Sequence, residues 1–119
     1  MDNKAVGGLI ITEDVIAKMA SVAAQEVDGV AGLVKKPQDL KSVFAKGDES
    51  KAIKVTIKDS VINIEVHISV KENHKVTTVA EAVQKNVKTT VQNMTGSAVT
   101  RVDVFIEDVV FNTENQDAQ

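Results

Sequence analysis

The sequence contains few residues whose side chains could carry out catalysis or bind a metal ion. His67 lies in an alternating stretch and His74 in a polar connection, and neither has a carboxylate or second histidine at a spacing typical of metal sites. We interpret both as surface histidines. Glu26 falls inside the apolar arc of a helix, and we expect its carboxylate to reach the backbone of the following turn or water.

Motifs that would indicate an enzyme are absent from the sequence. The chain has no cysteine, which excludes thiolate catalysis, zinc knuckles and disulfide frameworks. It has no G-x-S-x-G sequence, no P-loop, no G-x-G-x-x-G and no convincing set of Ser, His and Asp. We therefore expect no enzymatic activity, no catalytic residue, no cofactor and no bound metal.

Charge is distributed unevenly, although the net charge is only -3. Residues 35–58 hold seven lysines and three acids, whereas residues 103–119 hold five acids and no base. The alternative function is thus a small RNA-binding module that uses the Lys-rich 35–58 connection. Against it, the sequence has no Tyr or Trp for base stacking and an overall negative charge. We therefore expect no nucleic acid as a partner.

The first part of the chain predicts a strand, a helix and a second strand. The run "GGLIIT" indicates a buried strand at about residues 8–12. Thr12, followed by two acids, is typical of a helix start, and we expect a helix to about Val27 with Gly29 as the stop. The apolar arc of this helix comprises Val15, Ile16, Met19, Val22, Ala23 and Val27, and "VAGLV" follows as a strand.

A long polar connection follows, punctuated by Pro37 and Gly47. Asp39 can cap one or two helical turns in which Leu40, Val43 and Phe44 share a face. We interpret these turns as a small lid that places Phe44 on the core, with a partner-binding knob as the alternative.

The clearest strand signal is "IKVTIKDSVINIEVHISV", in which apolar and polar residues alternate on both sides of Asp59 and Ser60. This pattern predicts an antiparallel hairpin with one buried and one wet face.

The stretch "KVTTVAEAVQKNVKTTVQNMTG" is rich in β-branched residues, yet its period is helical. Its apolar residues lie within about 120° on a helical projection, opposite Glu81, Lys85, Lys88 and Gln92. Thr78 and Glu81 fit a capping box, Glu81 and Lys85 a favourable pair, and Gly96 a stop. Because burying each Val outweighs its helix-propensity cost, we predict a helix with a core-facing Val stripe.

The last element, "AVTRVDVFIEDVVF", predicts a closing strand with Phe105 among charges on its polar side. Phe105 either stacks on neighbouring side chains or anchors an interface. Together the elements predict an α+β, two-layer sandwich: a mainly antiparallel sheet of four to five strands with two helices on one face. We expect one domain over residues 1–111 and a disordered tail over residues 112–119.

No apolar run approaches the roughly 20 residues that span a bilayer, and the amino-terminal residues make a poor signal peptide. We expect a soluble cytoplasmic chain without direct membrane insertion.

The stretch "GGLIITEDVIAKMASVAAQEVDGVAGL" resembles the opening of the alkaline shock protein family of Gram-positive bacteria, also called the envelope stress response or general stress protein family. The stretch "EVHISVKENHKVTTVAEAVQKNVKTTVQNMTGSAVTRVDVFIEDV" is similar to its second half, and the likeness covers about residues 7–111. The resemblance implies a non-enzymatic cytoplasmic protein linked to cell-envelope homeostasis under alkaline or other stress. Some relatives self-associate and are held at the membrane by small membrane-anchored partners.

The leading hypothesis is therefore a scaffold or adaptor that acts through self-association, as a possible homo-oligomer, and through protein partners. The surfaces that a partner could use are the wet rim of the second helix, the open sheet face and the lid. The candidate partner-contact residues are Glu81, Lys85, Lys88, Gln92, Phe105 and Phe44.

Overall fold

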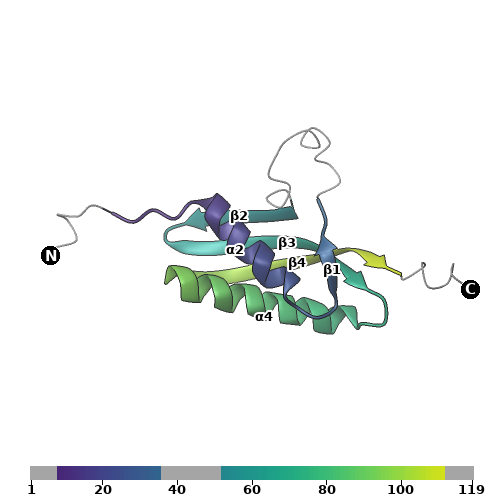
Figure 1. Ribbon diagram of the computed structural model, residues 1–119. Coiled ribbons are helices and arrows are strands. Elements are labelled where there is room, and N and C mark those ends of the chain that lie inside the picture. The colour runs from purple at the N-terminus through teal and green to yellow at the C-terminus, as the bar shows by residue number, and fades with distance from the viewer. Residues whose placement is uncertain (1–7, 36–51, 112–119) are drawn as a thin grey trace, which may run out of the picture.

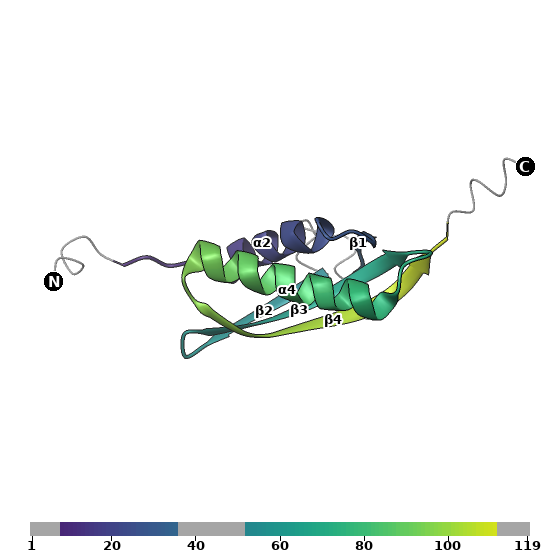
Figure 2. The same ribbon diagram turned by 90° about the horizontal axis from the view of Figure 1, so that it is seen from below.

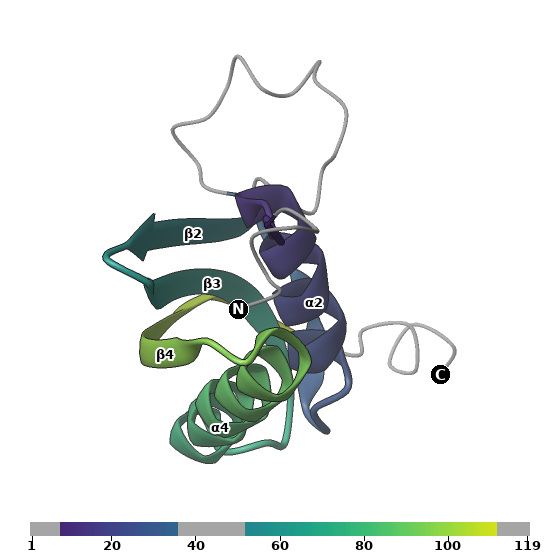
Figure 3. The ribbon, with the colours of Figure 1, turned by 90° about the vertical axis from the view of Figure 1, so that its left-hand side faces the viewer.

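The computed structural model describes residues 8–35 and 52–111. In chain order the elements are α2 (Glu13–Gln25), β1 (Val30–Leu33), β2 (Ile53–Lys58), β3 (Val61–Lys71), α4 (Val76–Thr95) and β4 (Ala98–Val110) (Figure 1). Both helices lie on the same side of the sheet (Figures 2 and 3). The predicted α+β sandwich is confirmed. The predicted lid with Phe44 and the predicted tail at residues 112–119 lie outside the described residues.

Strand β3 is the centre of the sheet, since it pairs with each of the other strands described. Strands β1 and β2 pair antiparallel with successive parts of β3 along one side. Strand β4 pairs with β3 along its whole length on the other side, and this pairing is parallel. Helix α4 provides the crossover that a parallel pair requires.

The predicted hairpin is confirmed as β2 and β3. Its turn consists of Asp59 (φ 53°) and Ser60 (φ 67°), both in the left-handed region, as a two-residue primed turn requires. The alternating residues of β3 face the helices, and the intervening polar residues lie on the open face.

The Val stripe of α4 forms the centre of the core. Val79, Val83, Val87 and Val91 are fully buried, as predicted, and they pack in one cluster with the apolar residues of the sheet. The ends of the predicted stripe, Val76 and Met94, are exposed. The buried part of the stripe therefore runs from Val79 to Val91.

The buried face of α2 differs from the predicted one. Val15 and Val22 are exposed, while Ser21 is 1% exposed. The residues that face the core are mostly small: Ile16, Ala17, Ala20, Ser21, Ala23 and Ala24. Helix α2 packs against both the sheet and α4 (Figure 2). The small side chains allow this close approach, and the helix is rotated accordingly, so that larger apolar residues point outward.

Helix α2 begins with a side-chain cap, whereas helix α4 does not. The Thr12 cap is confirmed, because its Oγ1 accepts a hydrogen bond from the Val15 amide at 3.3 Å. The predicted capping box of Thr78 and Glu81 is wrong: α4 begins at Val76, and Lys75 is its N-cap residue without a side-chain bond. The turn containing Asn73 (φ 68°) brings the chain into the helix before Thr78 is reached. Gly96 ends α4 with φ 76°, as predicted.

The strand predicted at residues 8–12 is also absent from the described structure. Leu9 and Ile10 are each 85% exposed. The segment joins the domain at Thr12, beside the β2–β3 turn, and extends away from the sheet (Figure 1). It therefore lies beyond the end of the nearest strand and has no strand beside it to pair with.

Candidate functional site

The predicted rim of α4 is only partly available to a partner. Glu81, Lys85 and Lys88 are exposed, and no ion pair between Glu81 and Lys85 occurs in the described part of the chain. Gln92 has a structural contact instead: its Oε1 accepts a hydrogen bond from the Val99 amide at 3.1 Å. This bond ties the end of α4 to the start of β4.

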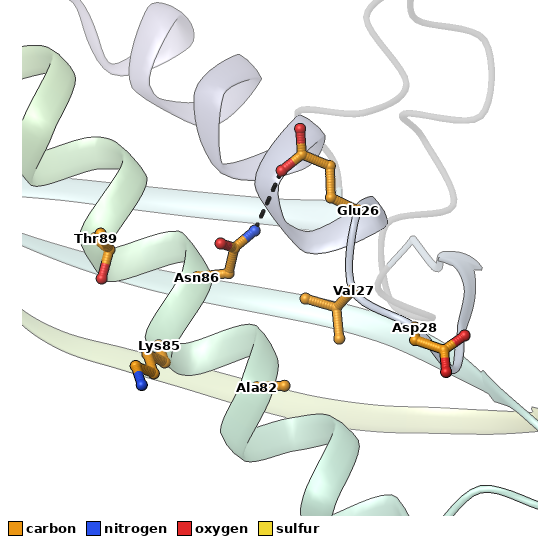
Figure 4. Close-up of a pocket in the computed structure, with 7 residues that line it drawn as sticks. All are labelled: Glu26, Val27, Asp28, Ala82, Lys85, Asn86 and Thr89. Carbon is orange, nitrogen blue, oxygen red and sulfur yellow. Dashed lines mark hydrogen bonds between the residues drawn. The ribbon is translucent and has the colours of Figure 1, made fainter.

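A groove of about 500 Å³ separates the C-terminal end of α2 from α4 (Figure 4). Its α2 side carries two carboxylates, Glu26 and Asp28, and its α4 side includes Lys85. The full lining consists of Glu26, Val27, Asp28, Ala82, Lys85, Asn86 and Thr89. Opposite charges thus lie on the two walls of a partly apolar groove.

Asn86 connects the two walls of the groove. Its Nδ2 donates to the Ala23 carbonyl at 2.7 Å and to Glu26 Oε1 at 3.3 Å (Figure 4). The Ala23 carbonyl is one of the last four of α2, which have no partner within the helix. Glu26 is exposed to water, one of its two predicted environments, and its carboxylate also contacts Asn86 on α4.

The open face of the sheet contains a cluster of ionisable groups around a buried histidine. His67 is 3% exposed, so the prediction of a surface histidine is wrong. Its Nε2 lies 2.7 Å from Glu65 Oε2, and its Nδ1 lies 2.5 Å from Glu107 Oε2. The two glutamate side chains are themselves about three-quarters buried. The cluster spans the pairing of β3 with β4.

The hydrogen bonds in this cluster depend on which atoms can donate and which can accept. A neutral imidazole has one N–H donor and one acceptor, whereas a carboxylate only accepts. With a carboxylate at each ring nitrogen, both contacts are hydrogen bonds if the imidazole carries two protons or one carboxyl group keeps its proton. The contact with Glu107 joins β3 to β4, whereas Glu65 lies on β3 itself, two residues before His67.

Phe105 covers this cluster. The rings of Phe105 and His67 stack at 4.5 Å between centroids with 10° between their planes. Stacking, the first of the two predicted roles, is therefore confirmed. The Phe105 side chain remains 43% exposed, so that part of the ring is also accessible to a partner.

The structure places the predicted contact residues in separate regions rather than in one site. Lys85 lines the groove and Phe105 lies on the opposite, open face of the sheet, while Phe44 lies outside the described residues. Sequence reasoning missed Asn86 and the His67 cluster. Alternation placed His67 and Glu65 on one face, but Glu107 joins them only through the register of β4.

Two further findings concern the described ranges only. Among residues 8–35 and 52–111, no three His, Asp or Glu side chains are arranged to hold a metal ion. Neither α2 nor α4 has the combination of length and apolar character needed to span a membrane.

Comparison with known proteins gives relatives of similar length. The chain is 32% identical to the uncharacterized protein YqhY of Bacillus subtilis (strain 168), covering 96% of this chain and 85% of that protein. It is also 32% identical to the uncharacterized protein YloU of the same strain, covering 87% and 88%.

Solved structures of MamM CTD variants share the fold. One has a TM-score of 0.56 at 17% identity and covers 80% of this chain and 90% of that chain. Another has a TM-score of 0.52 at 15% identity and covers 82% and 98%. At this identity the likeness concerns the fold alone.

The family pattern that matches residues 1–111 is that of alkaline shock protein 23, described by a cell envelope-related function. The chain therefore belongs to the alkaline shock protein 23 family.

Proposed function

We propose that this protein is a non-enzymatic scaffold or adaptor of the cell-envelope stress response, which includes alkaline stress. It acts by self-association and by binding protein partners. It resides in the cytoplasm and reaches the membrane through a small membrane-anchored partner. The family and its cell envelope-related function support the general assignment.

The main support for this proposal is that polar side chains are engaged in contacts within the fold, whereas several large apolar side chains are exposed. The polar groups that chemistry would need are held in structural bonds: His67 between two carboxylates, Asn86 on α2, and Gln84 on the Val102 carbonyl at 3.1 Å. Several large apolar side chains are instead exposed, among them Leu9, Ile10, Val22, Met94 and Phe105. Of these, Leu9 and Ile10 are adjacent in the chain, and neighbouring exposed apolar side chains are typical of protein-contact surfaces.

The groove between α2 and α4 is the surface that we assign to a protein partner. It combines the carboxylates of Glu26 and Asp28 with the ammonium group of Lys85 around the apolar side chains of Val27 and Ala82. A polypeptide segment with an apolar residue flanked by charges of both signs would match this groove. Charge complementarity of this kind favours specificity and the association rate.

Site-specific photocrosslinking in the native host tests this function. A photoreactive residue replaces Lys85 in the groove, and a matched variant carries it at Arg101 on the open sheet face, which is also exposed. We expect discrete protein adducts from Lys85, including one in the membrane fraction, and fewer from Arg101. The proposal fails if neither position yields a protein adduct and the purified chain is monomeric at all concentrations. A salt-dependent complex with single-stranded RNA in place of protein adducts would favour the alternative function.

A further inference from the structure

Residues 8–11 have the composition of a buried strand, but they form no strand in the structure and two of them are exposed. Three consecutive apolar residues follow Gly8, and Leu9 and Ile10 are each 85% exposed. Burying a Leu or Ile side chain contributes about 1.5 to 3 kcal/mol, so their exposure leaves a substantial gain unused. The segment is therefore a candidate for a strand that forms on binding.

In the described structure this segment is not paired with its own sheet. It enters α2 at Thr12, whose hydroxyl caps the helix, and this point lies beside the β2–β3 turn (Figure 1). From there residues 8–11 extend outward, past the end of β2. Folding back along β2 would require the chain to reverse direction at the capped residue. A strand for this segment must come from another molecule.

The same chain offers an acceptor for such a strand. Strand β2 pairs with β3 on one side, and its outer edge has no partner strand in the described residues. Beside its end is a cavity of about 260 Å³, lined by Ile16, Ile57 and Ile62 and, from the segment itself, by Leu9 and Ile11. The opposite edge of the sheet is less suitable, because Gln84 already donates to the Val102 carbonyl on β4.

Charges on the donor and acceptor are complementary. Glu13 and Asp14, both exposed, follow the segment directly in the first turn of α2. Lys54 and Lys58, also exposed, lie near the two ends of β2. Whichever direction the added strand runs, the acidic pair arrives near one of the lysines. Complementary charges on two surfaces of one chain favour a second copy as the occupant.

We propose that residues 8–11 of one molecule add as a strand to the outer edge of β2 of a second copy. This inference rests on the proposed function and identifies the surfaces of its self-association. Strand addition supplies backbone hydrogen bonds, and the apolar cavity and the lysines supply specificity. Because donor and acceptor are different surfaces, the contact is heterologous, so each copy can bind one neighbour at each surface. Such a contact closes into a ring or continues as an open chain, depending on the rotation that relates neighbouring copies.

The double variant Leu9→Ser/Ile10→Ser tests the donor. Both side chains are mostly exposed, so the variant is expected to fold, with an unfolding midpoint equal to that of the parent. Sedimentation velocity across a concentration series should show self-association weakened by about tenfold or more, given the apolar area removed. The control Val22→Ser removes an exposed apolar side chain from the outer face of α2 and should associate like the parent.

Disulfide crosslinking tests the contact directly, because the natural chain has no cysteine. Single variants Leu9→Cys and Ile10→Cys are each mixed with Thr56→Cys, which carries its thiol at the middle of β2. At least one mixture should give a crosslinked heterodimer. A mixture with Thr100→Cys on β4 should not.

Three outcomes would overturn the inference. One is unchanged association of the double variant, and another is absence of the crosslink to Thr56→Cys. A third is that the double variant loses cosedimentation with phosphatidylglycerol vesicles while its self-association is intact, which would make the segment a membrane contact. In each case the parent still associates, so the proposed scaffold function survives and only the assigned surface is wrong. A parent that is monomeric at every concentration would contradict both.

Discussion

The substitution Gly29→Ala should destabilise the fold more than any other glycine change among the described residues. Gly29 has φ +98°, a conformation that costs other residues about 1 to 3 kcal/mol. A Cβ atom there would lie 2.7 Å from Val79 Cγ2 and 2.8 Å from His74 Cδ2. Val79 is buried in the core, so relieving this contact means shifting α4 or the ring, at about 1 to 3 kcal/mol. The sum is about 2 to 6 kcal/mol.

Urea unfolding followed by circular dichroism measures this cost. Total stabilities of about 5 to 15 kcal/mol are typical, so the change would remove a large fraction, and the melting temperature should fall by about 10 °C or more. Gly32→Ala is the matched control, because Gly32 lies in β1 and an added Cβ there meets nothing within 4 Å. Equal midpoints for the two variants would refute the packing argument at Gly29.

Three further substitutions test the turn, the sheet cluster and the contact between the helices, each by its unfolding midpoint. Ser60→Gly relieves a left-handed residue in the β2–β3 turn and should stabilise the protein by about 0.5 to 1 kcal/mol, whereas a lower midpoint would contradict the turn assignment. His67→Leu removes the imidazole that contacts the Glu65 and Glu107 carboxylates and should cost about 2 to 4 kcal/mol; adding Glu107→Leu should recover part of this loss, and failure to recover would contradict the assigned pairing. Asn86→Ala leaves the Ala23 carbonyl without its 2.7 Å donor and should cost about 1 to 2 kcal/mol, and an unchanged midpoint would show that water replaces that donor.

The fold was predictable where a long periodic pattern agreed with its packing. The valines of α4 form a helix despite their preference for strands, because the free energy gained by burying each Val exceeds its helix-propensity cost. The hairpin followed from two alternating runs separated by two residues, Asp59 and Ser60. Both patterns are local in sequence, which is why they could be read without the structure.

Features that depend on contacts between distant elements could not be read in this way. Val15 and Val22 belong to the apolar arc of α2, but close packing on α4 through alanines turns them outward. His67 is buried on a face expected to be wet, because the parallel register with β4 brings Phe105 and Glu107 to it. The groove could not be predicted from the sequence for the same reason, because it is formed by two helices that are distant in the chain.

The apolar segment before α2 failed as a strand prediction for a different reason. Its composition is that of a strand, and we infer that the missing element is a second copy rather than a different local structure.

Sedimentation velocity of the purified parent chain over a wide concentration range, alone and beside Leu9→Ser/Ile10→Ser, tests the central claim most directly. We expect the parent to associate in a concentration-dependent manner and the double variant to stay largely monomeric at the same concentrations. A parent that sediments as a monomer throughout would contradict the claim that this protein acts by self-association.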